Sequence, residues 1–302
     1  MHPFVALMRT YCIDYTNSHD QSLYDEIMEP DYVVHINGLD LVRSSSYSRA
    51  VTALFDVAPG LGLVVHELVL NGDRLCMHFS EHGAFPGADG PVLACWRGIG
   101  LYKWNGERLT ENYVEQDYLS MQAQLAAGPP HPLTPPHLDP WVTTQPVAAD
   151  PAAEAVVRSW LSRGDLADVD RLEADDGRTG APYAPILDVQ EVTVNDLFSA
   201  GTTVPFHVTQ HGTYRGGLGP EHDGHVGEAA TLNVVGIARV EAKRVTQVDA
   251  VTTRMLAADG LAGTRSMARG EPLVPRVGPD HAQGGHEALG SRGQGRGGPP
   301  DG

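Results

Sequence analysis

The feature that most constrains the fold of this chain is a pair of Asn-Gly dipeptides, Asn71-Gly72 and Asn105-Gly106. Each dipeptide lies between two β-rich runs. Asn-Gly in this setting predicts a tight hairpin, because both residues tolerate the positive φ of a type I′ turn. Residues 61–125 are therefore predicted to form a four-stranded antiparallel meander, which is closed by a helix over residues 119–126.

Loops of two residues would also set the register of both hairpins. In the first hairpin, Leu68 would face Leu75 and His66 would face Met77, so that one face is apolar except for His66 and Glu81. In the second hairpin, one face would hold Trp96, Gly98, Gly100, Tyr102, Leu109, Glu111, Tyr113 and Glu115. The other face would hold Cys95, Arg97, Ile99, Leu101, Thr110, Asn112, Val114 and Gln116. Alternation alone leaves open which of these two faces is the inner one.

Helices are predicted before this meander. Phe4, Leu7, Met8, Tyr11 and Tyr15 follow helical spacing. Asp20 can cap a short helix over residues 21–28, residues 31–37 read as a strand, and a further helix follows residues 44–46. Helices followed by a curved antiparallel sheet indicate an α+β domain over residues 1–127.

The same pattern returns after a linker. Residues 128–150 contain seven prolines and no periodicity, which predicts a linker that is stiff in places. After it, three blocks match in one order: HELVLNG with QEVTVND, FSEHGAF with VTQHGTY, and GIGLYKWNGERLTENY with VVGIARVEAKRVTQVD. We therefore predict an internal duplication. The second domain, residues 151–260, is expected to be truncated and to lack counterparts of the 31–37 strand and of the helix after it. A disordered tail is predicted over residues 261–302.

Composition excludes several classes of partner. The chain has 302 residues, 41% hydrophobic residues and a net charge of −17, which argues against nucleic acid or an anionic membrane as a partner. Its three cysteines form no C-x-x-C motif, so a reducing, cytoplasmic setting is expected. No signal pattern and no apolar run of 18 residues is present, and this argues against export and membrane spanning.

Three segments resemble the SnoaL-like polyketide cyclases of the NTF2-like superfamily: YCIDYTNSHDQSLYDEIMEPDYVVH, FSEHGAFPG and GIGLYKWNGERLTENYVEQDYLSMQAQL. The resemblance covers most of residues 4–126 and, more faintly, residues 151–257. It implies two cone-shaped domains, in each of which a curved sheet wraps around helices and a pocket opens between them. The family contains cofactor-free aldol cyclases, isomerases, epoxide hydrolases and dehydratases.

The resemblance also orients the last long strand of the first domain. In the family this strand tends to read Glu-His-aromatic-Asp, with the His and the Asp pointing into the pocket. Here the matching residues are Glu111, Asn112, Tyr113 and Val114. The resemblance therefore implies that Asn112 and Val114 lie on the inner face, although neither can transfer a proton as His and Asp can.

With this orientation, polar groups converge on an apolar cone. The predicted catalytic residues are His66, Glu81, Arg97 and Asn112, and the predicted substrate-binding residues are His35, Phe79, Ile99, Val114 and Gln116. Burial raises the pKa of a carboxyl and lowers that of an imidazole, which suits both for acid–base work at neutral pH. Arginine stays charged and can hold an oxyanion. In the structural alternative, Glu81 and Arg97 pair with each other and His66 bonds a backbone carbonyl.

In the second copy, the ionisable residues of the predicted pocket are replaced by neutral ones, whereas the residues of one turn motif are retained. In the block alignment His66 becomes Gln190, Glu81 becomes Gln210, Arg97 becomes Asn233 and Asn112 becomes Val248, whereas His82 and Gly83 persist as His211 and Gly212. This pattern fits one working pocket and one structural partner. Relaxed drift in a decayed copy would give the same pattern.

Other motifs are weaker. On a strand, His78 and His82 would lie about 13 Å apart, so we expect no metal site there. His222–His225 reads as a solvated turn, and Glu115 and Asp117 as surface charges. No P-loop, dinucleotide fingerprint or nucleophile elbow occurs, and no cofactor is expected.

The sequence therefore favours a cofactor-independent acid–base enzyme, of the cyclase, isomerase or hydrolase type, that acts on a small, largely apolar metabolite such as a polyketide-like molecule. The alternative is a non-catalytic protein of the same superfamily that binds a small molecule or acts as a scaffold. The two domains are expected to pair through their sheets as an internal pseudo-dimer, which would leave the chain monomeric.

Overall fold

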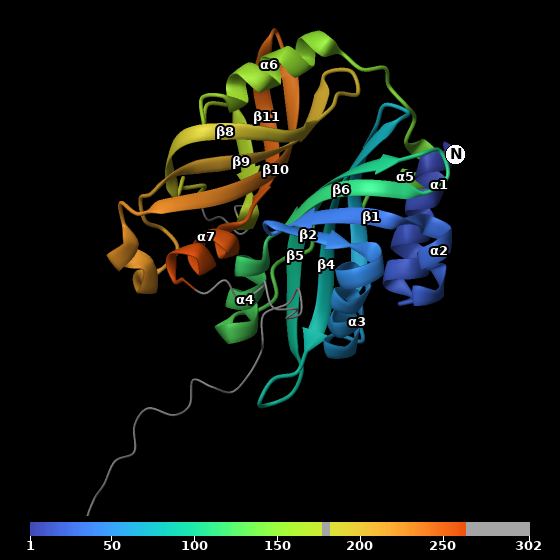
Figure 1. Ribbon diagram of the computed structural model, residues 1–302, viewed down its shortest axis with the longest axis horizontal. Coiled ribbons are helices and arrows are strands. Elements are labelled where there is room, and N and C mark those ends of the chain that lie inside the picture. Colours follow the sequence, from blue (N-terminus) through green and yellow to red (C-terminus); the bar gives the residue numbers. More distant parts are fainter. Residues whose placement is uncertain (177–181, 264–302) are drawn as a thin grey trace, which may run out of the picture.

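The computed structural model describes residues 1–176 and 182–263, which form two curved β-sheets flanked by helices (Figure 1). This arrangement is the α+β class predicted from the sequence. Within the described residues, no helix is both long enough and apolar enough to cross a membrane. The predicted tail begins at the last residue of the final helix, and residues 264–302 lie outside the described part of the chain.

The N-terminal unit, residues 1–127, has a six-stranded sheet in the order β2-β1-β6-β5-β4-β3. β1 runs parallel to β6, and the other neighbouring strands are antiparallel. Its elements are α1 (Pro3–Arg9), the π-helical η1 (Thr10–Asn17), the 3-10 turn η2 (Gln21–Leu23), α2 (Tyr24–Ile27), β1 (Met28–Ile36), β2 (Leu39–Val42), η3 (Arg43–Tyr47), α3 (Ser48–Val57), β3 (Gly62–Leu70), β4 (Arg74–Phe85), β5 (Val92–Trp104), β6 (Leu109–Gln116) and α4 (Tyr118–Ala127).

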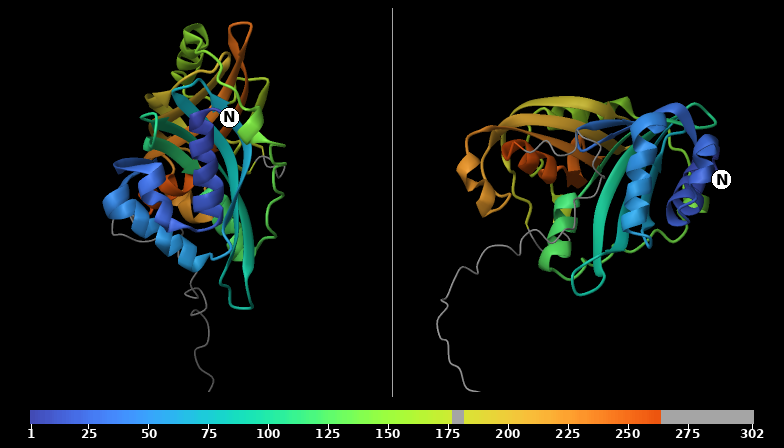
Figure 2. Two further views of the ribbon diagram at one scale, coloured as in Figure 1. Left: turned by 90° about the vertical axis from the view of Figure 1, so that its right-hand side faces the viewer. Right: turned by 60° about the horizontal axis from the view of Figure 1, so that its bottom comes forward.

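The helical segments α1, η1 and α3 lie on the concave side of this sheet. The first helix forms where predicted: the His2 side chain caps the amide of Phe4, and η1 keeps Tyr15 on the same buried face as Phe4 and Met8. Both views of Figure 2 show α1 and α3 together on one side of the blue-to-teal sheet. The cone expected from the resemblance is therefore present.

A shift of both turns and two β-bulges change the predicted pairing of the strands. In both hairpins the Asn is paired with an Arg, and the loop is Gly-Asp or Gly-Glu, one residue later than expected. Further along, His66 is an extra residue between the pairs Val65–Phe79 and Glu67–His78. Thr110 is likewise an extra residue in β6. Because side chains alternate with a period of two, each single insertion moves the residues beyond it to the opposite face.

The C-terminal unit, residues 151–263, repeats this strand order without a counterpart of β2 in its described part. Its sheet runs β7-β11-β10-β9-β8, with β7 parallel to β11. Its elements are α6 (Pro151–Leu161), β7 (Arg171–Ala174), β8 (Leu187–Leu197), β9 (Thr203–Tyr214), the 3-10 segment η5 (Pro220–His225), β10 (Ala229–Glu241), β11 (Arg244–Thr252) and α7 (Arg254–Leu261). β7 occupies the place of β1, so the expectation that this strand has no counterpart was wrong.

The strand pairings give a residue-by-residue correspondence between the units. Glu81 pairs with Trp96, and Gln210 pairs with Leu232 at the same place in its sheet. This confirms the alignment of Glu81 with Gln210. It corrects another match: the counterpart of the His66 bulge is the bulge at Asn195, because the next pairs are Glu67–His78 and Asp196–His207. Gln190 lies in a separate bulge of β8, between Val189 and Glu191.

The two sheets contact each other through their outer faces. A buried apolar cluster joins them, made of Val69, Cys76, Ile99 and Leu101 from the N-terminal unit and Phe198, Ala200, Val235, Ile237 and Val251 from the C-terminal unit. Ion pairs between Arg74 and Asp196 and between Arg239 and Glu67 flank it. The pairing of the sheets predicted from the sequence is therefore present within one chain.

The linker runs along the edge strand β3. The amide of His137 donates to the carbonyl of Val65 and that of Val147 to the carbonyl of Leu70, both at 2.9 Å. Between these contacts lies the short helix α5 (Pro140–Thr143), which Asp139 caps. The linker is thus held on the N-terminal sheet at several points and covers an edge that would otherwise expose backbone donors and acceptors.

Candidate functional site

A small cavity of about 60 Å³ lies inside the N-terminal cone, between the sheet and the helical segments η1, η3 and α3. Its lining is apolar and tyrosine-rich, with three polar side chains from the sheet. It consists of Tyr11, Val34, Ile36, Tyr47, Val51, Leu54, Leu63, Phe79, Glu81, Tyr102, Asn112, Val114, Gln116 and Tyr118. Five of the predicted site residues, Phe79, Glu81, Asn112, Val114 and Gln116, are therefore brought together as expected.

Glu81 supplies the carboxyl group of this cavity. It lies on β4 and is 7% exposed. Its Oε1 accepts a long hydrogen bond of 3.5 Å from Nε2 of Gln116, and its Oε2 has no hydrogen-bond partner among the described residues. Burial raises the pKa of Glu81 to about 7, although the bond from Gln116 acts in the opposite direction. The carboxyl can therefore both accept and donate a proton near neutral pH.

The cavity also contains tyrosine hydroxyls. The hydroxyls of Tyr11 and Tyr47 lie 3.3 Å apart. Burial raises the pKa of Tyr11, Tyr102 and Tyr118 well above the usual tyrosine value. These side chains therefore stay protonated at neutral pH and can donate hydrogen bonds to an oxygen that gains negative charge.

Asn112 faces the same space from β6. It is 1% exposed, it pairs with Tyr102 on β5, and its Oδ1 has no hydrogen-bond partner among the described residues. An unsatisfied buried acceptor is costly unless a bound group supplies a donor. The orientation of β6 implied by the family resemblance is thus correct.

Four predicted site residues lie outside the cone. On β5 the inner residues are Trp96, Gly98, Gly100 and Tyr102, because the insertion at Thr110 pairs Tyr102 with Asn112. Arg97 and Ile99 consequently point to the outer face, where Ile99 is buried between the two sheets. His66 and His35 complete the four, and their placement in the pocket was likewise wrong.

The two histidines have other partners. His66 is displaced by its bulge, and its ring nitrogens lie 2.8 Å from Oγ of Ser80 and 3.1 Å from the carbonyl oxygen of Pro135. The outer side of β1 carries His35, whose ring stacks on Tyr113 and lies within 3.1 Å of Glu111. Neither histidine can reach a molecule inside the cone.

Arg97 belongs to a buried polar cluster at the contact between the units. Its Nη1 donates to the carbonyl oxygen of Asp175 at 3.0 Å, and its Nη2 lies 3.3 Å from Nε2 of His78. Arg254 forms ion pairs there with Asp117, Asp175 and Asp176. Asp117 is 2% exposed, so its interpretation as a surface charge was wrong.

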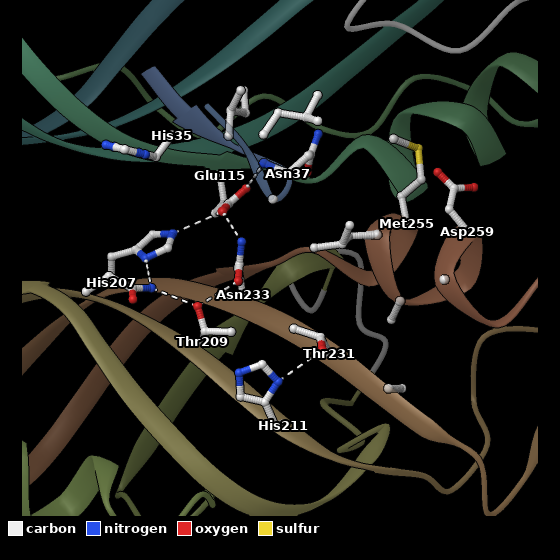
Figure 3. Close-up of a pocket in the computed structure, with 18 of the residues that line it drawn as sticks. His35, Asn37, Glu115, His207, Thr209, His211, Thr231, Asn233, Met255 and Asp259 are labelled. Atoms are coloured by element: carbon white, nitrogen blue, oxygen red, sulfur yellow. Dashed lines mark hydrogen bonds and ion pairs between the residues drawn. The ribbon is translucent and has the colours of Figure 1, made fainter. Parts of the chain in front are cut away.

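A second buried network lies across the contact, in a larger groove of about 960 Å³ (Figure 3). Glu115, only 1% exposed, accepts hydrogen bonds from the amide of Asn37 at 2.8 Å and from Nδ2 of Asn233 at 2.9 Å. Nε2 of His207 lies 3.0 Å from the same carboxylate. Asn195 is 2.9 Å from the other nitrogen of this histidine. Glu115 was also predicted as a surface charge, and that prediction was wrong.

Within residues 1–176 and 182–263, no group of three or more His, Cys, Asp or Glu side chains is arranged to hold a metal ion. The His222–His225 segment forms η5 at the surface, where His225 lies 3.1 Å from Glu228. The cavity tyrosines are the part of the site that sequence reasoning missed. The helical spacing of Tyr11 and Tyr47 predicted core positions, and that pattern carried no sign of an adjacent carboxyl.

No protein-family model matches the chain, and no curated protein matches it. Among solved structures, the chain is similar to IdmH, a proposed polyketide cyclase from Streptomyces antibioticus, with 18% identity and a TM-score of 0.37 over 42% of this chain and 100% of that one. It is similar to a proposed SnoaL-like polyketide cyclase from Shewanella denitrificans OS-217, with 19% identity and a TM-score of 0.37 over 41% and 98%. It is also similar to AclR, a proposed hydroxylase from Streptomyces galilaeus, with 16% identity and a TM-score of 0.35 over 40% and 93%.

Proposed function

We propose that the chain is a cofactor-independent acid–base enzyme in which Glu81 moves a proton on a small, largely apolar substrate. The observation that supports this most directly is the carboxyl itself. One oxygen of Glu81 faces a tyrosine-lined cavity without a protein partner among the described residues, and burial brings its pKa to about 7. Buried groups with strongly shifted pKa values in a cavity are typical of catalytic sites.

This arrangement suits chemistry at a carbon beside a carbonyl. The ionised Glu81 takes the proton from that carbon, and the electrons of the C–H bond move into an enolate. Tyrosine hydroxyls of the cavity donate hydrogen bonds to the enolate oxygen. Return of the proton from Glu81 to another carbon completes an isomerisation. If the enolate carbon instead attacks a second carbonyl of the same molecule, Glu81 protonates the new alkoxide and a ring closes.

The cavity volume limits what the cone admits in this structure. About 60 Å³ is well below the roughly 300–1,000 Å³ of ordinary ligand pockets. Tyr47, Val51 and Leu54 form one wall and belong to η3 and α3. Displacement of this helical segment from the sheet would enlarge the cavity. We therefore propose that the reacting end of a small or slender molecule, such as a polyketide-like metabolite, enters beneath α3.

The test is carbon-bound proton exchange. Small cyclic ketones and 1,3-diketones are incubated with the protein in D₂O, and deuterium uptake beside the carbonyl is followed by NMR. We expect uptake above the buffer rate, with a loss of about 10²-fold or more in Glu81→Gln, as for other general acid–base groups. His66→Asn is the matched control, because His66 lies outside the cone. Asparagine is the residue at the equivalent bulge of the C-terminal unit, Asn195. Equal uptake in wild type and Glu81→Gln would refute the assignment.

A second candidate is a protein that binds a small molecule or acts as a scaffold without turnover. The small cavity volume favours it, as does Val114, which stands where the family resemblance would place an acid. This candidate predicts that Glu81→Gln retains ligand affinity and that no exchange is catalysed. In either case we place the protein in a reducing cytoplasm, since Cys12, Cys76 and Cys95 are buried free thiols.

A further inference from the structure

Two regions at the contact between the units are built from equivalent residues of the two sheets. The first region lies beside α4, and the second lies beside α7. α4 begins two residues after β6 ends, and α7 begins two residues after β11 ends. The strand pairings and these helix starts match residues across the contact as follows: Ser80 with Thr209, Cys95 with Thr231, Arg97 with Asn233, Asp175 with Asn37, Ser120 with Leu256, and Gln124 with Gly260. Asn37 and Asp175 even share a positive φ, 51° and 48°. The two sides are thus equivalent places in the fold.

On the first side, beside α4, residues of the linker cover the region. The chain leaves α4 and returns across it: the amide of His131 donates to Oε1 of Gln124 at 2.8 Å, and the ring of His131 lies 3.0 Å from Oγ of Ser120. The carbonyl oxygen of Pro135 then lies 3.1 Å from His66. Only about 20 Å³ of cavity remains under His131 and Pro132.

On the second side the equivalent place is the open groove of about 960 Å³. Leu256 and Gly260 of α7 line the groove. They are the counterparts of Ser120 and Gln124, which contact the linker on the first side. Asn37 also lines it, is 3% exposed, and has no hydrogen-bond partner for either side-chain amide atom among the described residues. Figure 3 shows α7 at one end of this groove, with Met255 and Asp259 at its margin.

We propose that the open groove binds the chain's own C-terminal segment, which begins at Thr264. The chain leaves α7 next to the groove, just as residues 128–137 leave α4 next to the first side. Residues 264–302 lie outside the described part of the chain, and their first residue follows closely on the end of α7 and the lining of the groove. That segment has 39 residues, and Pro272, Pro275 and Pro279 lie in its first half, the part nearest α7; prolines are also frequent in the linker.

Hydrogen exchange measured by mass spectrometry tests this proposal on the full chain and on a chain that ends at Gly263. We expect amides of residues 190–195, 229–233 and 255–260 to exchange several-fold faster in the shortened chain, because the segment no longer covers them. Amides of β3 and of the linker should not change. Addition of a synthetic peptide of residues 264–302 should restore the slow exchange.

A second variant keeps the test valid if the shortened chain is unstable. A Cβ at Gly260 would meet no atom within 4 Å, so Gly260→Trp in the full chain fills the groove without a clash of its Cβ. It should reproduce the faster exchange at residues 190–195. Gly60→Trp is the matched control, since Gly60 is equally unobstructed and lies elsewhere. Identical exchange in all four proteins would overturn the proposal, as would protection that appears only at high protein concentration and so comes from a second copy.

Discussion

Nε1 of Trp96 donates to Oε1 of Gln116 at 2.5 Å, and this bond fixes which end of the Gln116 amide faces Glu81. With its oxygen engaged by the indole, Gln116 presents its Nε2 to the Glu81 carboxylate. The three side chains come from β5, β6 and β4, neighbouring strands of one sheet. The protonation of the carboxyl is thus linked to two neutral residues, Gln116, which was predicted in the same pocket, and Trp96, which was not.

The first prediction concerns pH and stability. The ordinary pKa of Glu81 is 4.5, and burial raises it to about 7 in the folded state. Between these values the folded protein retains a proton that the unfolded chain has lost. The free energy of unfolding should therefore fall as the pH rises from about 4.5 to 7, by about 3 kcal/mol at 1.4 kcal/mol for each pH unit. Urea titrations at several pH values measure this.

Glu81→Gln isolates this effect, because it removes the ionisation and retains the shape. The variant should be more stable than wild type at pH 8, by up to about 3 kcal/mol, and nearly equal to it at pH 4. Burial also raises the pKa of Asp175, to about 6, but Asp175 is present in both proteins and cancels in their difference. A difference that does not change with pH would show that Glu81 titrates normally.

The second prediction concerns the bond from Gln116. Its removal in Gln116→Leu should raise the pKa of Glu81 above about 7, because that hydrogen bond stabilises the carboxylate. Trp96→Phe should act in the same direction more weakly, since it frees the amide to rotate. NMR of the Glu81 side-chain carboxyl carbon across pH 5–9 follows the titration. A midpoint unchanged in both variants would contradict the linkage.

The third prediction tests the packing between the sheets. Leu101 is fully buried in the cluster that joins the two units, so Leu101→Ala should lower the free energy of unfolding by about 2–5 kcal/mol. Leu138 in the linker is fully exposed, and Leu138→Ala should have almost no effect. Thermal melts of both variants give the comparison. Equal losses would mean that the contact adds nothing specific.

Because each outer sheet face is already covered by the other within one chain, we expect a monomer of 32.4 kDa. Light scattering at several concentrations measures this mass. A stable dimer in which two N-terminal sheets contact each other would contradict the expectation. Cross-linking followed by mass spectrometry identifies such a contact.

The sequence was sufficient for what depends on local pattern. The helix from Phe4, both hairpins, the helix after β6 and the position of Glu81 inside the cone all follow from spacing and turn residues. The resemblance to a family supplied the direction in which Asn112 faces. These features need no knowledge of the opposite strand beyond its turn.

The sequence was insufficient where one inserted residue decides the result. Bulges at His66 and Thr110 move His66 and Arg97 out of the cone, and neither residue type marks a bulge. The sequence also could not predict which residues are buried between the units, because that depends on the position of the second sheet. Glu115 follows the pattern of an outer-face charge, and only the partner sheet places Asn233 and His207 against it.

The last prediction concerns this buried carboxylate. Glu115→Ala removes the acceptor of the Asn37 amide and of Asn233 and leaves His207 without its carboxylate, so it should lower the free energy of unfolding by about 3–5 kcal/mol. Asp40 is the matched control, because it also lines the open groove and lies 2.6 Å from His35. Its side chain is 75% exposed, so Asp40→Ala should cost no more than about 1 kcal/mol. Urea titrations of both variants measure the free energy of unfolding. A loss in Glu115→Ala as small as that in Asp40→Ala would show that water readily replaces the carboxylate. The network would then not hold the units together.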